Sequence, residues 1–416
     1  MVNVEHLPHV YTTLQNGLLN SDHHSTNPII HLMAKLTEIT TKPTPTKNAT
    51  TSWGSGLLFF TVAVVAVALA AVQLDTYETV AYPLHELGET MHVPARKNSA
   101  SLPGVEKIGL GQLSGPEEIV YEPNSGVLYT GCHDGWIKRV MLTNSAADSV
   151  VEKWVNTGGR PLGLAVDESG NLYVADAYKG LLKISTDGKI ELLTDEAEGV
   201  KLGLTDGVVV AKNGMIYFTD ATYKYIYREA LNDLLEGRPH GKLLSYDPST
   251  KETKVLARDL YFANGVELSP DQDFLIFSET FMRRCSRYYL QGEKKGTIDI
   301  FAKDLPGLPD NVRYDGEGHY WIAMPWDNSL LFKNTHKYPF LRKIFAFTLK
   351  HLRKVPDLMK FGGVIVLDLE GKAVGGYYDE TWGMTSSAVK IGENLYLGSV
   401  TKPYITRLNL TQYPLN

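Results

Sequence analysis

The chain has 416 residues, of which 43% are hydrophobic and 21% charged, a composition that supports a buried core and excludes a disordered chain. Lys and Arg number 41 against 47 Asp and Glu, and the resulting net charge of −6 argues against a nucleic-acid-binding surface. Two cysteines, Cys132 and Cys285, are too few for a disulfide-rich scaffold or a four-cysteine zinc site.

The first 95 residues divide into three segments. Residues 1–52, rich in Thr, His, Asn and Pro, predict a disordered tail. Residues 53–74 predict a membrane signal-anchor, because the run 56–72 has Thr61 as its single polar residue. As a helix this run would extend roughly 25–30 Å, enough to cross a bilayer core. Residues 75–95 are expected to be a linker.

The charges that flank this run set an orientation. Lys42 and Lys47 precede it and Asp75 follows it, so the positive-inside rule places the amino terminus in the cytosol and the larger part in the lumen or outside the cell. A cleaved signal peptide is the competing interpretation, and it delivers the domain to the same side. We therefore expect a membrane-anchored protein of the secretory pathway, in the endoplasmic reticulum, vacuole or plasma membrane, which contacts the membrane through residues 56–72.

From residue 96 onward one strand pattern occurs six times. Each copy is a turn followed by a β-branched and aromatic strand, as in Gly170-Asn-Leu-Tyr and Gly214-Met-Ile-Tyr. The strand starts are separated by 44, 44, 59, 45 and 75 residues, close to the spacing of four-stranded blades with two insertions. We therefore predict an all-β fold, a six-bladed β-propeller over residues 96–416, preceded by the single transmembrane helix or signal segment. The strands begin at Leu128, Leu172, Ile216, Leu275, Tyr320 and Leu395.

The second insertion, residues 336–361, predicts a basic amphipathic helix. One interpretation packs this helix over the top of the propeller with its lysines in solvent. The other makes it a lid over the channel mouth that touches the membrane. The expected apolar face consists of Phe340, Leu341, Ile344, Phe345 and Leu352, and the expected positive charges are Arg342, Lys343, Lys350, Arg353 and Lys354.

Oxygen-bearing side chains stand where the inner strands of a propeller would converge on its channel. Glu117, Asp206, Asn264 and Asp310 come from four predicted blades, and Asn311 adds an amide. Taken singly, Asp-Gly and Asn-Gly pairs are common turn signals. Together these residues form an oxygen set that suits calcium, with carbonyls and waters completing roughly six to eight ligands, whereas zinc would favour clustered His or Cys. The sequence therefore predicts a calcium site.

No nucleophile motif accompanies these oxygens. The sequence has no Gly-x-Ser-x-Gly turn, no Gly-rich phosphate loop and no His-Glu-x-x-His. The catalytic residues therefore stay unassigned.

Longer phrases resemble a known family. Phe262-Ala-Asn-Gly-Val-Glu-Leu-Ser-Pro-Asp, Leu305-Pro-Gly-Leu-Pro-Asp-Asn311 and Gly159-Arg-Pro-Leu-Gly163 are similar to the strictosidine synthase-like family, in particular to its plant members and to members like the adipocyte plasma membrane-associated protein. The resemblance covers about residues 96–410. It implies a six-bladed propeller that is related to paraoxonases and calcium-dependent lactonases.

The paraoxonase motifs imply roles for single residues. Their metal phrases are similar to the segments that contain Glu117 and Asn264 and to the pair Asp310–Asn311, which implies that these residues are ligands. The paraoxonase Leu-Asn-Asp phrase meets Leu204-Thr-Asp206, so Asp206 must compensate for a lost ligand amide. The catalytic His of the paraoxonase Pro-His-Gly phrase is replaced by Leu162, which cannot move a proton.

Three functions stay open from the sequence. The first is a calcium-dependent hydrolase of small-molecule esters or lactones, in which the cation polarises the carbonyl group. The second is a strictosidine synthase-type Pictet–Spengler carbon–nitrogen lyase of alkaloid biosynthesis. Ser386 occupies the position of the glutamate that this reaction needs, so we expect no strictosidine formation. The third is a non-catalytic, membrane-tethered binding propeller. The sequon at Asn409 is expected to carry a lumenal glycan.

Overall fold

The computed structural model describes residues 52–94, 96–98, 104–352 and 362–415. The predicted tail up to residue 51 and the last part of the helical insertion, 353–361, lie outside the described residues. The chain divides into two compact units, residues 1–69 and 70–416, and all the described strands belong to the second unit.

Helix α3 (Ser52–Leu74) covers the apolar run of the sequence. Among its described side chains, Leu58, Phe60 and Val62 are each more than half exposed. Within the described residues, no helix combines the length and the apolarity that crossing a membrane requires. The membrane anchor or signal segment at residues 53–74 therefore stays a prediction.

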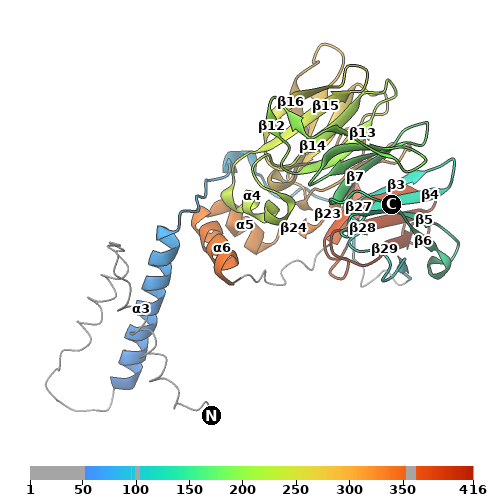
Figure 1. Cartoon of the computed structure of the whole chain (residues 1–416). Coiled ribbons are helices and arrows are strands. Elements are labelled where there is room, and N and C mark those ends of the chain that lie inside the picture. Colours follow the sequence, from blue (N-terminus) through green and yellow to red (C-terminus); the bar gives the residue numbers. More distant parts are fainter. Residues whose placement is uncertain (1–51, 95, 99–103, 353–361, 416) are drawn as a thin grey trace. The chain divides into compact units, whose positions relative to one another are not determined.

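Six sheets form the ring of the second unit; each has four antiparallel strands, and one of them gains a fifth, parallel strand (Figure 1). Blade 1 consists of β3 (Ile119–Glu122), β4 (Val127–Gly131), β5 (Trp136–Met141) and β6 (Val150–Asn156). Blade 2 consists of β7 (Pro161–Val166), β8 (Leu172–Asp176), β9 (Gly180–Ile184) and β10 (Ile190–Thr194). Blade 3 consists of β13 (Thr205–Val210), β14 (Ile216–Asp220), β15 (Gly241–Asp247) and β16 (Glu252–Leu260). The fourth and fifth are β17 (Ala263–Leu268), β18 (Phe274–Glu279), β19 (Arg284–Tyr289) and β20 (Ile298–Ala302); and β22 (Val312–Tyr314), β23 (Tyr320–Met324), β25 (Gly362–Leu367) and β26 (Ala373–Asp379).

The sixth blade closes the ring with a strand from the start of the domain. It consists of β27 (Thr385–Ile391), β28 (Asn394–Ser399) and β29 (Ile405–Asn409), and its outer strand is β2 (Glu106–Ile108), which pairs antiparallel with β29. β1 (Arg96–Asn98) adds a parallel fifth strand to β26. The inner strands β3, β7, β13, β17, β22 and β27 contact one another in a closed cycle. The predicted all-β six-bladed propeller is therefore confirmed.

The six repeated phrases are the second strands of the six blades, β4, β8, β14, β18, β23 and β28. These strands are buried on both faces between neighbouring blades, which explains their nearly continuous apolar and aromatic sequence. The two wider spacings between the repeated phrases, 59 and 75 residues, correspond to insertions. The first, between β14 and β15, contains the helix α4 (Ala230–Glu236), which the sequence reading did not identify. Shorter elements are η2 (Leu84–Glu86), η4 (Ala146–Asp148), η5 (Tyr227–Glu229), η6 (Thr280–Met282), β11 (Glu196–Ala197), β12 (Val200–Lys201), β21 (Gly307–Leu308) and β24 (Trp326–Asp327).

The second insertion is helical as predicted, but it contains two helices, α5 (Leu330–Lys337) and α6 (Pro339–Leu352). They break at Tyr338, because the following Pro339 disfavours a helical residue before it. Arg342 was expected to be one of the positive charges of this helix, but it does not lie in solvent. Its side chain is fully buried and donates to the backbone oxygens of Leu235 at 3.1 Å and Thr335 at 2.6 Å. Arg342 thus fixes α6 to α4.

The segment expected to be a linker packs against the propeller. Tyr82 is buried, and its hydroxyl donates to the backbone oxygen of Leu234 at 2.9 Å. The amide of Met91 donates to the backbone oxygen of Asp304 at 2.7 Å. The described residues of this segment are therefore part of the folded domain.

Candidate functional site

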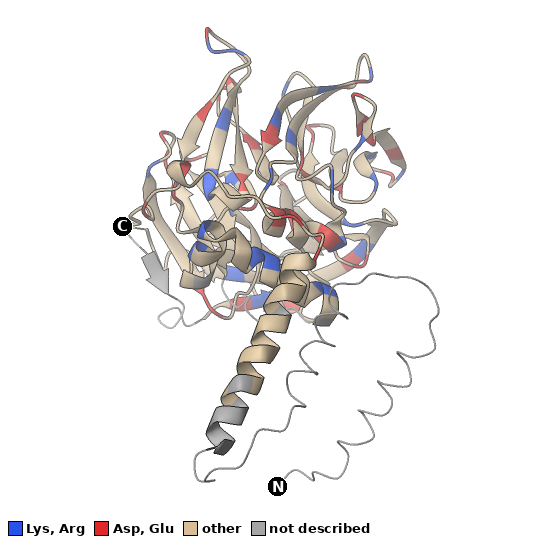
Figure 2. Cartoon of the chain, turned by 90° about the vertical axis from the view of Figure 1, so that its left-hand side faces the viewer, with Lys and Arg blue, Asp and Glu red and all other residues tan. Residues whose placement is uncertain are grey.

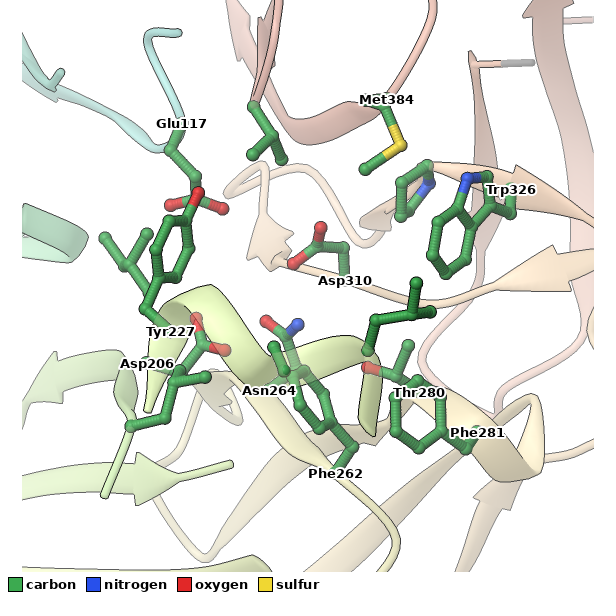
Figure 3. Close-up of a pocket in the computed structure, with 16 residues that line it drawn as sticks. Glu117, Asp206, Tyr227, Phe262, Asn264, Thr280, Phe281, Asp310, Trp326 and Met384 are labelled. Atoms are coloured by element: carbon green, nitrogen blue, oxygen red, sulfur yellow. The ribbon is translucent and has the colours of Figure 1, made fainter. Parts of the chain in front are cut away.

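A cavity of about 150 Å³ lies where the inner strands converge. Figure 3 shows the carboxyl groups of Glu117, Asp206 and Asp310 and the amide of Asn264 turned toward one central space. These four side chains come from blades 1, 3, 4 and 5, and each is at most 6% exposed. The walls are mainly apolar and include Leu162, Leu204, Phe262, Phe281, Trp326, Met384 and Val400.

Irregular pairing at the start of the inner strands aims two of these side chains. The register between β13 and β14 shifts between Thr205 and Val208, and the shift contains Asp206. The register between β17 and β18 shifts in the same way after Ala263, and the shift contains Asn264. Such bulges commonly re-aim a side chain next to a functional site. The Asp-Gly and Asn-Gly pairs are therefore strand residues, and reading them as turns is wrong.

The glycine after each of these residues allows neighbouring blades to approach closely. A Cβ atom on Gly207 would lie 2.8 Å from the backbone oxygen of Asn264, and one on Gly265 would lie 2.5 Å from the Cα of Asn311. Any side chain here would push the next blade away from the axis. These glycines thus keep the polar groups of blades 3, 4 and 5 around one cavity.

Hydrogen bonds from blades 5 and 6 hold Glu117 in place. The hydroxyls of Ser386 and Ser387 both donate to its backbone oxygen, at 2.7 and 2.8 Å. The side-chain amide of Asn311 donates to its Oε1 at 2.9 Å. Asn311 therefore lies behind Glu117 and does not line the cavity. The two serines looked isolated in the sequence, and nothing local in it indicates that they position a residue of blade 1.

Two buried oxygens at the cavity have no hydrogen-bond partner, Oε2 of Glu117 and Oδ1 of Asn264. Such groups cost free energy unless something pairs with them. Burial, with the charges of Asp310 and Asp206, raises the pKa of Glu117 well above its usual range. Burial, with the charge of Glu118, raises the pKa of Asp206 to about 8. Burial and the charge of Asp206 likewise raise the pKa of Asp310. The cavity therefore favours a positive charge.

Arg160 and Tyr227, which no pattern in the sequence predicts to be site residues, complete the surroundings of the cavity. The guanidinium of Arg160 is buried, donates to the backbone oxygen of Gly115 at 3.2 Å, and lowers the pKa values of Glu117 and Asp206. It lies 5.5 Å from the ring of Tyr227, which lines the cavity. Arg160 falls within the family phrase Gly159–Gly163, but its neighbours come from distant segments of the chain.

The ligand groups of the cavity determine whether it could hold a cation. In the part of the chain that the structure describes, no three His, Cys, Asp or Glu side chains form a ready-made metal-binding group. The cavity nevertheless offers three carboxyls and an amide oxygen, two of whose atoms are unpaired, and this chemistry fits a hard cation such as calcium. The metal-ligand roles of Glu117, Asp206, Asn264, Asp310 and Asn311 stay predictions.

Fold and site together define a six-bladed propeller with an acidic axial cavity. The family model described as strictosidine synthase matches residues 206–293, and the model described as strictosidine synthase-like, N-terminal matches residues 97–140. The chain is 51% identical over 363 residues to Protein STRICTOSIDINE SYNTHASE-LIKE 6 of Arabidopsis thaliana. This alignment covers 86% of this chain and 97% of that protein. The chain therefore belongs to the strictosidine synthase-like family, as the resemblance implied.

More distant proteins share the fold. The adipocyte plasma membrane-associated protein of Gallus gallus is 38% identical over 333 residues, covering 73% of this chain and 78% of that protein. A gluconolactonase from Xanthomonas campestris superposes with a TM-score of 0.53 at 18% identity, over 75% of this chain and 91% of its own. A calcium-binding regucalcin from Agrobacterium tumefaciens gives 0.53 at 14% identity, over 76% and 95%. At these identities the two structures show the fold alone.

Proposed function

We propose that this protein is a calcium-dependent hydrolase of small-molecule esters or lactones. The observation that carries the proposal is the pair of unpaired, buried oxygens of Glu117 and Asn264, which share one cavity with two further carboxyls. The gluconolactonase and the calcium-binding regucalcin of the same fold make this chemistry plausible for the family's architecture. We further propose that the protein is a membrane-anchored glycoprotein of the secretory pathway.

Different residues of the cavity would carry out different steps of this reaction. Glu117, Asp206, Asn264 and Asp310 would hold calcium, which when bound polarises an ester or lactone carbonyl and offsets the charge that develops on its oxygen. One of the cavity carboxyls would accept a proton from the attacking water. Tyr227 lines the cavity, and since burial raises its pKa its hydroxyl stays protonated and could donate a hydrogen bond to the substrate. The apolar walls would exclude bulk water.

The Pictet–Spengler alternative lacks its carboxylate. Ser386 is fully buried, and its hydroxyl is committed to the backbone oxygen of Glu117 at 2.7 Å. A hydroxyl in that position cannot shuttle the amine and iminium protons of the condensation. A non-catalytic binding propeller is the remaining alternative, and activity assays separate it from the hydrolase.

The test is a panel of acyl esters and lactones, assayed with the full chain in detergent. We expect turnover that a chelator abolishes and added calcium restores. Asp310→Asn should lower kcat/KM by about 10- to 100-fold. The matched control is Asp299→Asn, because Asp299 lies on the outer strand β20 and pairs with Arg287 at 2.9 Å. A calcium-loaded chain that is inert across the panel would contradict the proposal and favour the binding propeller, and turnover of tryptamine with secologanin would favour the lyase.

A further inference from the structure

The segment that contains α5 and α6 has a charge opposite to that of the whole chain. Residues 328–356 include seven Lys and Arg and no Asp or Glu, whereas the chain carries a net charge of −6. Figure 2 shows blue residues among the helices at the edge of the domain. Such a positive patch on an acidic protein attracts anionic partners, and its attraction falls as salt rises.

Apolar side chains are exposed beside this charge. Leu330 is 78% exposed, Tyr338 46%, and Phe340 and Leu341 are each 38% exposed. Tyr338, Phe340 and Leu341 lie at or just after the break between α5 and α6, and Leu330 is the first residue of α5, on which Lys333 and Lys337 are also exposed. We call these six residues the α5–α6 surface. Exposed apolar residues next to lysines are typical of helices that lie in the headgroup region of a bilayer.

Buried contacts fix which side of the helix pair faces outward. Arg342 and Ala346 are buried toward the domain, and the Nε2 atom of His336 bonds the backbone oxygen of Phe281 at 2.6 Å. The α5–α6 surface is therefore unable to turn inward without breaking the bonds of Arg342 and His336. Its exposure is a property of the packed domain.

Helix α6 is also bound to the point where the apolar run ends. Lys343 Nζ donates to the backbone oxygen of Gln73 at 3.2 Å, and Lys350 pairs with Asp75 at 2.8 Å. Gln73 and Asp75 flank Leu74, the last residue of α3. If the run 56–72 enters a bilayer, α6 is thus held within a few residues of the place where the chain leaves it.

We propose that the α5–α6 surface binds the anionic lipid surface of the membrane that residues 56–72 enter. The lysines contact lipid phosphate or carboxylate groups, while Leu330, Phe340 and Leu341 enter the boundary between headgroups and acyl chains. This orients the domain on the membrane, where a tether alone would leave it free to rotate. The proposal does not depend on the hydrolase reaction.

The test uses a single introduced thiol on the full chain. Cys132 and Cys285 are both free and fully buried, so a cysteine at Leu341 or Leu330 is the site that a polarity-sensitive fluorophore labels. The matched control is Leu192→Cys, because Leu192 is 54% exposed on the outer strand β10. The labelled chains are reconstituted in phosphatidylcholine vesicles with and without phosphatidylserine, and lipids that carry a nitroxide quencher are added.

We expect quenching of at least about twofold at positions 341 and 330 and none at 192, with the effect stronger in the anionic vesicles. Lys333→Glu with Lys337→Glu should reduce the lipid-contacting fraction by about fivefold for each lysine. The control pair Lys212→Glu and Lys251→Glu, exposed in blade 3, should leave it unchanged. Equal quenching at 341 and 192, no dependence on anionic lipid, or a chain that associates with neither vesicle would each overturn the proposal.

Discussion

Glu117 and Glu118 are neighbours in the chain, are almost equally buried, and have opposite surroundings. Glu118 pairs with Arg313 at 2.8 Å and accepts the backbone amide of Leu164 at 2.8 Å. Arg313 also approaches Glu267 at 3.6 Å, so one guanidinium serves two carboxylates. Glu117 instead faces the cavity with one unpaired oxygen.

We call the group of Glu118, Arg313 and Glu267 the finished network, and the carboxyl groups around Glu117 the unfinished network. Burial raises the pKa of Glu118 to about 7 although Arg313 opposes the shift. Around Glu117 the nearest charges are other carboxyls, and Arg160 alone opposes them. In the first network Arg313 gives the carboxylates a cationic partner from within the chain, whereas in the second the proposed cation would supply it. Variants that affect only one network can test this distinction.

The largest effect is expected when the finished network is broken. Arg313→Met leaves Glu118 and Glu267 buried without their cationic partner, and the loss should be about 3–5 kcal/mol of unfolding free energy. Urea unfolding of the full chain measures it, and the loss should be the same with chelator and with calcium. A loss that calcium repairs would mean that the two networks are not separate.

The unfinished network should make stability depend on pH. The folded-state pKa values of Glu117, Asp206 and Asp310 are raised, so the folded chain binds more protons than the unfolded chain. In chelator, stability should therefore be highest near pH 4 and fall as pH rises toward 8, by up to about 1.4 kcal/mol per pH unit for each group that titrates. Calcium should reduce the decline, and the part that remains comes from other buried carboxyls with raised pKa values, such as Glu118. Asp206→Asn should make the decline shallower, and a flat profile in the unmodified chain would contradict the account.

The two adjacent glutamates provide a matched pair of variants. At a calcium concentration about 100-fold above Kd, the unmodified chain should gain about 2.7 kcal/mol of stability. Glu117→Gln should lose most of that gain and, because it removes a buried carboxyl whose pKa is raised, should not lower the stability in chelator. Glu118→Gln should be less stable in both conditions and keep the gain. Thermal unfolding with and without calcium distinguishes the two, and equal behaviour would refute the comparison.

The smallest effect is expected for a substitution of the surface residue Asn409. Oδ1 of Asn409 accepts the hydroxyl of Thr411 at 2.6 Å at the end of β29. Asn409→Gln should remove one glycan from the chain expressed in a eukaryotic secretory host and leave the proposed calcium binding unchanged. Gel mobility before and after glycosidase treatment checks this, and an unchanged mobility would show that Asn409 carries no glycan.

The sequence predicts the blades better than it predicts the cavity. Second strands are recognisable because each carries its whole signal within a few residues, as Gly170-Asn-Leu-Tyr does. The bulge at Asp206 is not recognisable, because it depends on how β13 pairs with β14 and on the close approach of Asn264. For the same reason Arg342, a typical surface residue in a basic helix, could not be identified as buried. Its partners lie in α4 and in the segment before the propeller.

Calcium titration by calorimetry in two buffers of different ionisation enthalpy tests the central claim most directly. If the cavity carboxyls hold protons until a cation displaces them, the full chain should bind one calcium ion and release between about one and two protons at neutral pH. Glu117→Gln should weaken both the binding and the release. No saturable binding, or binding without proton release that Glu117→Gln leaves unchanged, would contradict a cation site at this cavity.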